Sequence, residues 1–459
     1  MIQPQSPICD PRVSVVRVVP AEYRDEGLIE QSVARAVELL NWDQGRSRPF
    51  GNIVHPDDRV LIKPNLVTHQ NQGPWGMEPL ITHRAHILAV ARAVLASQPF
   101  EVLIGDAPVQ GCDFETLLHD SGIGAACEDL RQADERFKGI VDFRRTSCDF
   151  VAGVRRPHDD LRELDRFVLF DLQGESLLEE ITTDERAFRV TCYDPQLLAN
   201  THSKGKHQYL VAREAIEADL VINLPKLKTH KKAGMTCAMK NLIGINGNKE
   251  YLPHHRIGGA ASGGDCYPDA STVKKSWEYA LDRMNSAGSL TTAFAWRQTA
   301  TQLGRLASIT GDKFGVEGSW SGNDTIWRTC LDLNRILIYG RTDGALADSP
   351  QRRVINIADG VIAGQGDGPL KPQPLGLGVI VAGVNPAAVD LVGSRLLCYQ
   401  AERIPCVRNA FAHFRWPLTE FSALDVAVCG DLGESIEEVG TYSKRFEISH
   451  PIGWTDAKV

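Results

Sequence analysis

The sequence lacks several features that would assign it to a common class of protein. Its 11 cysteines form no CxxC pair, so we expect neither a disulfide framework nor an iron–sulfur cluster. No apolar run is long enough to span a bilayer, and the first residues lack the basic and apolar regions of a secretory signal. A net charge of -8 argues against general nucleic-acid binding. We therefore expect a globular protein of the cytoplasm, with no membrane or nucleic-acid partner.

The sequence also lacks the strongest short motifs of catalysis. It contains no GxxxxGK[ST], no HExxH and no GxSxG, so a P-loop, a zinc-protease site and a nucleophile elbow are not indicated. The glycine-rich segment GQGDG departs from GxGxxG and follows the strand-like VINIADG instead of opening a helix. A dinucleotide-binding fold is therefore not indicated either.

Strand-like and helix-like segments alternate along much of the chain. The apolar strands are nearly continuous, which is typical of strands buried on both faces. The sequence therefore predicts an α/β fold with a mostly parallel sheet flanked by helices, interrupted by an irregular insertion and a helical insertion. The expected strands are residues 13–19, 59–67, 101–106, 219–223, 354–359 and 378–383, and the expected helices begin at residues 28, 83, 114 and 386.

The alternation of strand-like and helix-like stretches, and the places where it stops, divide the chain into segments. We expect an N-terminal α/β segment (1–127), a charged insertion or subdomain (128–195), a core α/β segment with a lysine- and histidine-rich loop (196–265), a helical insertion (266–315) and a C-terminal α/β segment with the GNDTIWR and GQGDGP motifs (316–459).

The lysine- and histidine-rich loop is the strongest sign of a ligand site. From Lys226 to Lys249 the sequence holds six lysines, His230 and no carboxylate. Glycines and asparagines are interleaved with the lysines, and both residue types let the backbone approach a ligand closely. The segment indicates a site for a phosphate, a carboxylate or a nucleotide tail. A solvated basic loop is the alternative interpretation.

Polar residues also stand where several expected strands end. In open α/β sheets ligands bind beyond the carboxyl ends of the strands, so we expect these side chains to converge on one cleft. Each could also be a turn or capping residue. The candidates at strand ends are Lys63, Asn65, Asp106, Lys226, Lys228, Asp359, Gly366, Asp367 and Gly368, and Asn241 follows them in the basic loop.

Three further residues are candidate metal ligands. Asp332 and Asn334 are two positions apart, so on an extended segment both oxygens would face one side. Oxygen ligands suit a hard divalent cation. His254, or its neighbour His255, could join His230 as a ligand. The alternative is that these residues are ordinary hydrogen-bonding groups of a strand, helix end or loop.

Several ordered motifs resemble the family catalogued as domain of unknown function 362. The resemblance covers about residues 55–125 and 195–435. Many members carry a cysteine-rich ferredoxin-like segment, which this chain lacks, and the family's reaction is not established. The motifs are KPNLV (63–67), GDAP (105–108), DLVINLPKLKTH (219–230), MKNLIG (239–244), GNDTIWR (322–328), IADGVIAGQGDGP (357–369) and VNPAAVDLVGSRLL (384–397).

The same region is more distantly similar to the catalytic domain of lactate racemase. That resemblance implies that His230 and Lys240 serve a nickel-pincer nucleotide, with Lys240 as its covalent anchor and His254 or His255 as a later histidine. The serine- and glycine-rich run of that family is replaced here by MTCAMKN.

Together these features predict an enzyme that acts on a small anionic metabolite by acid/base chemistry. Lys226, Lys228 and Lys240 would bind the anion, and His230 would exchange the proton. Asp106, Asp359 and Asp367 would hold a divalent cation or take the second proton-transfer role. Two alternatives remain: a non-catalytic binding or carrier protein for an anionic cofactor or metal, and a nickel-pincer-type racemase or epimerase.

Overall fold

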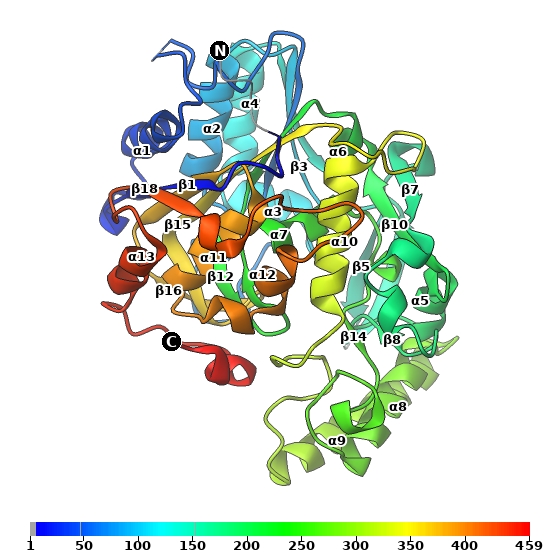
Figure 1. The fold of residues 1–459 in the computed structure, drawn as a ribbon. Coiled ribbons are helices and arrows are strands. Elements are labelled where there is room, and N and C mark those ends of the chain that lie inside the picture. Colours follow the sequence, from blue (N-terminus) through cyan, green and yellow to red (C-terminus); the bar gives the residue numbers. More distant parts are fainter. Residues whose placement is uncertain (1–5, 46, 152) are drawn as a thin grey trace.

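The computed structural model describes residues 6–45, 47–151 and 153–459. Its centre is an 11-stranded sheet with helices on both faces (Figure 1), which confirms the predicted α/β class. The main path of the sheet runs β18 (Ala427–Gly430), β1 (Arg12–Arg17), β17 (Val379–Gly383), β15 (Arg353–Asp367), β11 (Leu220–Leu224), β2 (Arg59–Pro64), β3 (Glu101–Asp106) and β4 (Phe137–Asp142).

The strands from β15 to β4 are all parallel, so their carboxyl ends lie along one edge. β12 (Lys226–His230) extends this edge because it pairs in parallel with the second half of β15. Its antiparallel partner is β13 (Gly234–Thr236), and β16 (Lys371–Leu375) folds back on the end of β15. The sheet is therefore mostly parallel, as predicted.

The central strands bury both of their faces. In β11, Val221 packs into one apolar core, whereas Leu220, Ile222 and Leu224 pack into the other, as the alternation of side chains along a strand requires. The helices divide between these two cores. One core receives α1 (Glu26–Leu39), α2 (Arg84–Ala96), α3 (Phe114–Asp120) and α4 (Ile123–Ala133), and the other receives α7 (Ala238–Asn241), α10 (Ile326–Tyr339), α11 (Pro386–Leu396), α12 (Pro405–Ala410) and α13 (Ile436–Ser443).

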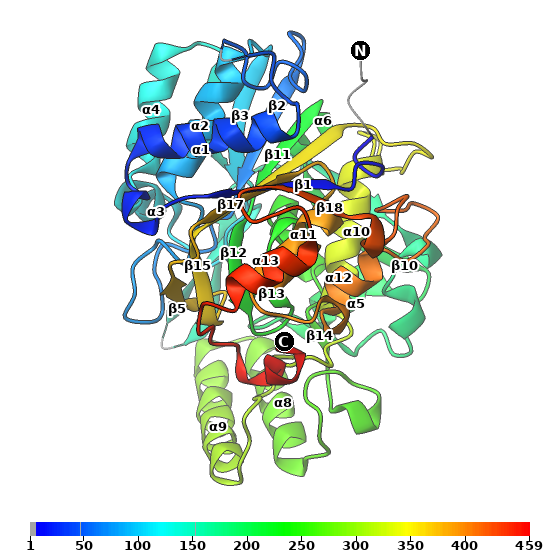
Figure 2. The same cartoon turned by 60° about the vertical axis from the view of Figure 1, so that its left-hand side comes forward.

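The rest of the chain forms smaller elements around α10. A three-stranded sheet and two strand pairs cover one side of the body, and two further helices project from one end of it in both views (Figure 2). The domain boundaries proposed from the sequence stay a prediction. These elements are β5 (Thr146–Val151), β6 (Val154–Asp160), β7 (Phe167–Asp171), β8 (Phe188–Arg189), α5 (Pro195–Thr201), β9 (His202–Ser203), β10 (Lys206–Ala212), α6 (Arg213–Glu217), β14 (His255–Arg256), α8 (Thr272–Asn285) and α9 (Leu290–Ile309).

The structure corrects the expected conformation of three segments. Lys226 and Lys228 belong to a buried strand instead of a loop. The glycine-rich segment after Asp359 is not a loop either, because β15 continues to Asp367 and pairs with β12 and β16. Residues 326–339 form a helix buried along its whole length, so Asp332 and Asn334 do not lie on the extended segment that was considered for them.

Among the helices of the described residues, none combines the length and the apolarity needed to cross a bilayer. The cytoplasmic location expected from the sequence stays a prediction.

Candidate functional site

A cavity of about 820 Å³ lies at the carboxyl ends of the parallel strands. Asp106 at the end of β3 and Asn65 just beyond β2 line it. His230 at the end of β12 and Lys240 on α7 also line it. The structure therefore brings together residues from strand ends that are far apart in the sequence, as the sheet topology predicts. Asn241 and Asp367 also line this cavity.

Lysines dominate the charge of the cavity. Lys231, Lys232, Lys240 and Lys249 line it, and within the described residues no carboxylate oxygen lies within 4.0 Å of their ammonium groups. Burial lowers the pKa of Lys249 to about 7, and repulsion from Lys240 and Lys232 acts in the same direction. Burial also lowers the pKa values of Lys240 and Lys232. Glu317 opposes the shift at Lys232, and Asp106 opposes it at Lys249. Grouped cations without a close ion pair repel one another and favour a bound anion.

His230 is fixed as a neutral hydrogen-bond donor. Its Nδ1 accepts hydrogen bonds from the backbone N–H groups of Lys232 (3.0 Å) and Ala233 (3.3 Å). Nδ1 therefore carries no proton, and the proton of the neutral ring must lie on Nε2. Burial lowers the pKa of His230 well below its usual value, and the charges of Lys240 and Lys228 lower it further. We conclude that the expected general-base role does not suit His230 in this geometry.

His254 has the opposite tautomer. Its Nδ1 lies 2.6 Å from the carbonyl oxygen of Leu252, which can only accept, so Nδ1 carries the proton. Burial and the charges of Lys249, Lys232 and Lys240 hold the pKa of His254 well below its usual value. The ring is therefore neutral near pH 7, with the lone pair on Nε2. His254 also lines the cavity, which makes it the candidate base.

Four buried polar atoms of residues that line the cavity lack a partner within the described chain. They are Gln110 Oε1, Arg155 Nε, Tyr193 Oη and Thr236 Oγ1, and Gln110, Tyr193 and Thr236 are only 6%, 4% and 3% exposed. Buried polar atoms are nearly always hydrogen-bonded. A ligand or water in the cavity could supply the missing partners. The guanidinium of Arg155 lies 3.9 Å from the ring centre of Tyr193.

Asp106 lines the cavity, and its buried partner Lys63 lies behind it. Lys63 Nζ lies 2.6 Å from Asp106 Oδ1 and also donates to Asn241 Oδ1 (3.2 Å). Burial raises the pKa of Asp106, while Lys63 and two backbone N–H groups oppose that shift. Gly244 is required beside this pair, because a Cβ there would lie 1.9 Å from the Asp106 oxygen. The acidic group is thus held by protein partners, and Lys63 does not line the cavity.

Lys226 and Asp359 lie outside the cavity. Lys226 Nζ is 3.0 Å from Asp359 Oδ2, and both side chains are completely buried. Tyr23 donates its hydroxyl to Asp359 and accepts from Lys226 at 2.7 Å. Burial alone would raise the pKa of Asp359, but Lys226 and these hydrogen bonds bring it to about 2. The structure therefore does not place this pair with His230, contrary to the expectation from the sequence.

Lys228, Gly366 and Gly368 make hydrogen bonds to residues in and beside the cavity but do not line it. Lys226, Lys228 and His230 share one face of β12, but only His230, at the strand's end, reaches the cavity. Lys228 Nζ donates to Asn65 Oδ1 at 2.8 Å and thus orients a cavity residue. The carbonyl of Gly366 accepts from the Thr229 hydroxyl (2.7 Å), and that of Gly368 accepts from the Lys231 N–H (2.9 Å).

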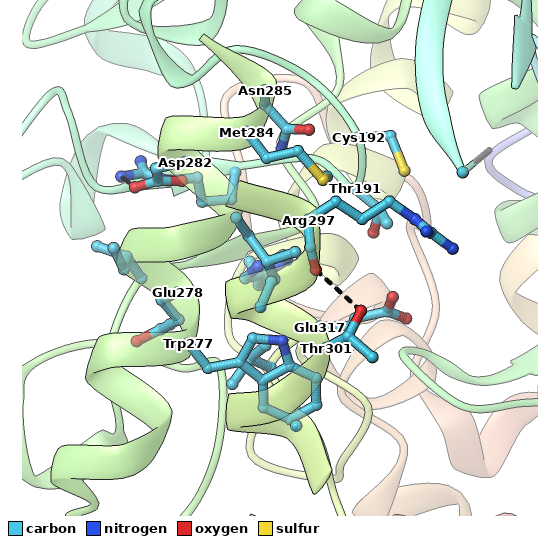
Figure 3. A pocket seen from close by; sticks show the side chains of 18 of the residues that line it. Thr191, Cys192, Trp277, Glu278, Asp282, Met284, Asn285, Arg297, Thr301 and Glu317 are labelled. Atoms are coloured by element: carbon cyan, nitrogen blue, oxygen red, sulfur yellow. Dashed lines mark hydrogen bonds and ion pairs between the residues drawn. The ribbon is translucent and has the colours of Figure 1, made fainter. Parts of the chain in front are cut away.

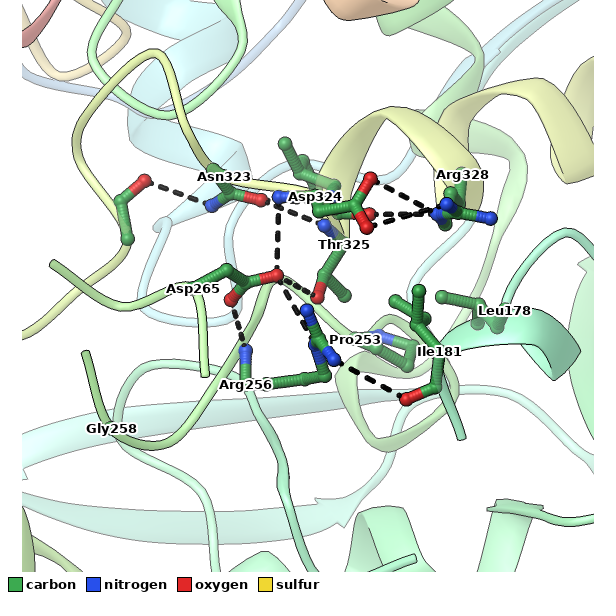
Figure 4. Close-up of polar contacts among 12 residues, drawn as sticks. Leu178, Ile181, Pro253, Arg256, Gly258, Asp265, Asn323, Asp324, Thr325 and Arg328 are labelled. Carbon is green, nitrogen blue, oxygen red and sulfur yellow. Dashed lines mark hydrogen bonds and ion pairs between the residues drawn. The ribbon is translucent and has the colours of Figure 1, made fainter. Parts of the chain in front are cut away.

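The GNDTIWR segment positions His254. Asn323 Nδ2 donates to the His254 carbonyl at 2.9 Å, and Thr329 Oγ1 donates to the Pro253 carbonyl at 2.8 Å. The Asn323 side chain also accepts from the first N–H groups of α10. Figure 4 shows the neighbouring contacts, in which Asp265 binds Thr325 and the backbone of Arg256.

Asp332 and Asn334 do not share a ligand site in this geometry. Residues two positions apart on a helix point in different directions. Asp332 accepts from Ser176, from Tyr209 and from Arg335 (2.9 Å), whereas Asn334 donates to the Met239 carbonyl. Within the described residues no group of three or more His, Cys, Asp or Glu is arranged to hold a metal ion. A divalent metal stays a prediction from the sequence.

Several cavity residues escape sequence reasoning. Lys232 and Lys249 stand within the basic segment, but nothing there separates them from Lys226 and Lys228. Gln110 is also missed, although it closely follows GDAP, and the rule that ligands bind beyond strand ends could have identified it. Arg155 and Tyr193 belong to the expected charged insertion, and no local pattern marks them.

Comparisons with known proteins agree with the motif-based assignment. The model of the family described as domain of unknown function (DUF362) matches residues 60–150 and 175–395. Thylakoid-associated protein sll1697 from Synechocystis sp. is 28% identical over 197 residues, which are 42% of this chain and 41% of that protein. This chain therefore spans less than half the length of that curated relative.

Two solved structures are distantly similar. A crystal structure of a protein from Thermotoga maritima has a TM-score of 0.34 at 11% identity, covering 80% of this chain and 57% of that one. The lactate racemase apoprotein from Thermoanaerobacterium thermosaccharolyticum has a TM-score of 0.34 at 12% identity, covering 85% and 58%.

Proposed function

Because this chain belongs to the domain of unknown function 362 family, whose description names no reaction, we propose a function from the cavity itself. The protein is an enzyme that binds a small carboxylate- or phosphate-bearing metabolite at the carboxyl ends of its parallel strands. It transfers a proton on that metabolite, with His254 as the base and His230 as the hydrogen-bond donor.

The observation that carries this proposal is the convergence of Lys232, Lys240 and Lys249 on one cavity without a carboxylate partner among the described residues. Each of these ammonium groups is partly removed from water, which is unfavourable unless an opposite charge approaches. A carboxylate or phosphate supplies that charge. The unpartnered atoms of Gln110 and Thr236 would then bind polar groups of the same ligand.

The two histidines supply complementary chemistry. Neutral His254 can take a proton at Nε2, and neutral His230 can donate a hydrogen bond from Nε2 to an oxygen that gains negative charge. Burial, reinforced by the lysine charges, holds the imidazoles neutral before the ligand binds. A bound anion offsets their charge and makes His254 a stronger base at the moment when it is needed.

His230 does not fit as a nickel ligand of the nucleotide that the resemblance to lactate racemase implies, although His254 has the tautomer that such a ligand needs. A histidine that binds a metal through Nε2 needs a lone pair there, and hence a proton on Nδ1. His230 accepts two backbone hydrogen bonds at Nδ1, so it is not arranged as such a ligand. We derive no step through that group.

One observation favours a second candidate, a non-catalytic carrier of an anionic ligand. Asp359 lies outside the cavity, and Asp106 is held by Lys63 and backbone N–H groups. A carrier would use the same lysines without needing a matched base and donor.

Calorimetric titration with a panel of small carboxylates and phosphates tests both candidates, and turnover of any ligand that binds separates them. The enzyme proposal predicts that His254→Gln abolishes turnover while leaving anion affinity within about threefold. A carrier predicts binding without turnover in the unmodified protein.

A further inference from the structure

A second cavity, of about 790 Å³, lies beside the first (Figure 3). It lies between α8, α9 and the segment that follows β8. Trp277, Leu281 and Met284 on α8 give it an apolar wall, and Ala300 and Gly304 on α9 also line it, with the Trp277 ring packed closely against Gly304. The acid/base chemistry proposed above does not use this space.

The two cavities share part of their lining. Val190, Thr191, Cys192 and Glu317 line both of them. Lys232, from the first cavity, donates to the Thr191 hydroxyl at 2.9 Å. Figure 3 shows Thr191, Cys192 and Glu317 on one side of the second cavity. The second cavity thus begins at Thr191, a residue in direct contact with Lys232.

The second cavity also has a buried polar atom without a partner. His255 is 5% exposed, lines this cavity, and its Nδ1 makes no hydrogen bond within the described chain. His254, the preceding residue, lines the first cavity. Adjacent histidines thus face neighbouring cavities, as consecutive residues at the start of a strand do.

We propose that the two cavities hold one ligand, an amphipathic anion. This inference rests on the proposed function: the anionic head lies among Lys232, Lys240 and Lys249, and the apolar part lies between α8 and α9. Two observations support it. A small acid alone would leave most of the combined space unused, and the second cavity offers apolar contact where the first offers charge. Each buried methylene should improve affinity by about three- to fourfold.

A series of alkyl phosphates tests this inference on the full chain. Calorimetry compares inorganic phosphate with butyl, hexyl and octyl phosphate, each below its micelle concentration. We expect affinity to rise with each pair of methylenes by roughly tenfold. Lys240→Ala should weaken every member of the series, including inorganic phosphate.

Thr301→Phe reports on the second cavity alone. Thr301 is an exposed residue of α9 that lines this cavity, so phenylalanine there should fill space without disturbing the core. We expect it to abolish the gain with chain length while leaving inorganic phosphate unaffected. Gln302→Phe is the matched control, because Gln302 is exposed on the same helix and does not line the cavity.

The outcomes separate the two proposals. If phosphate binds through Lys240 but chain length adds nothing, or if Thr301→Phe leaves the gain intact, the amphipathic ligand is overturned and the anion site stands. If octyl phosphate binds equally well in Lys240→Ala, the head lies elsewhere, for example near Arg297, and the inference is wrong. If no member of the series binds, both this inference and binding of phosphates in the first cavity fail.

Discussion

His230 and His254 use the same ring nitrogen in opposite ways. Nδ1 of His230 accepts from the backbone N–H of Lys232 at 3.0 Å, whereas Nδ1 of His254 donates to the carbonyl of Leu252 at 2.6 Å. In their neutral forms one Nε2 is therefore a donor and the other an acceptor. Both rings line the same cavity, so backbone contacts alone set one hydrogen-bond acceptor and one hydrogen-bond donor on its wall.

We expect these tautomers to be visible directly. A long-range ¹H–¹⁵N correlation spectrum of protein labelled in histidine, recorded at pH 7.5, should show Nδ1 protonated in His254 and Nε2 protonated in His230. His254→Gln and His230→Gln assign the two signals. A spectrum in which both rings carry the same tautomer, or in which His230 is doubly protonated, contradicts the assigned roles.

Anion affinity should fall as the pH rises through about 7. The pKa of Lys249 is about 7 in the free protein, and a bound anion raises it. Affinity is then full below pH 7 and decreases by up to tenfold per pH unit above it, until the pKa of the bound form is reached. Calorimetry from pH 6 to pH 9 measures this slope, and Lys249→Gln should flatten it. An unchanged slope in that variant would show that another group is responsible.

The lowered pKa of Lys249 should also make the stability of the fold depend on pH. The pKa of Lys249 is lower in the folded protein than its ordinary value of 10.5, so the unfolded chain binds more protons between these values. The contribution of Lys249 to the free energy of unfolding should therefore increase as the pH rises from about 7 towards 10.5. Urea unfolding of the unmodified protein and Lys249→Gln over this range checks the sign of the effect.

Tyr23→Phe should lower stability without affecting binding. The Tyr23 hydroxyl bridges the buried Lys226–Asp359 pair, and its loss leaves charged groups short of a partner. We expect a cost of about 1–3 kcal/mol in the free energy of unfolding, measured by urea denaturation. Because the pair lies outside the cavity, anion affinity should stay within about twofold of the unmodified protein. A tenfold loss of affinity would mean that Asp359 and Lys226 belong to the ligand site after all.

The sequence predicts the central strands of the main sheet, but not β4 and β18 at its edges, because strands buried on both faces are nearly continuous apolar runs. β3 and β17 end at the expected residues, Asp106 and Gly383. The rule that ligands bind at the carboxyl ends of parallel strands also places Asn65, Asp106 and His230 correctly around one cavity.

Pattern alone could not separate cavity lysines from buried ones. Lys226 and Lys240 look alike in the sequence, but Lys226 meets Asp359 from a strand more than a hundred residues away. Lys240 finds no such partner, because α7 carries it into the open end of the sheet. The histidine tautomers depend on backbone groups within two or three residues, and these are set by turn geometry instead of residue type.

The central claim is that the cavity binds an anion through unpaired lysines, and Lys240→Ala tests it most directly. Lys275→Ala is the matched control, since Lys275 is an exposed residue of α8 that does not line the cavity. Calorimetric titration with phosphate and with small carboxylates at pH 6.5 compares both variants with the unmodified protein. We predict that at least one anion binds, that Lys240→Ala weakens it by about tenfold or more, and that Lys275→Ala does not. Equal affinities in all the proteins, or no binding to any of them, would contradict the account.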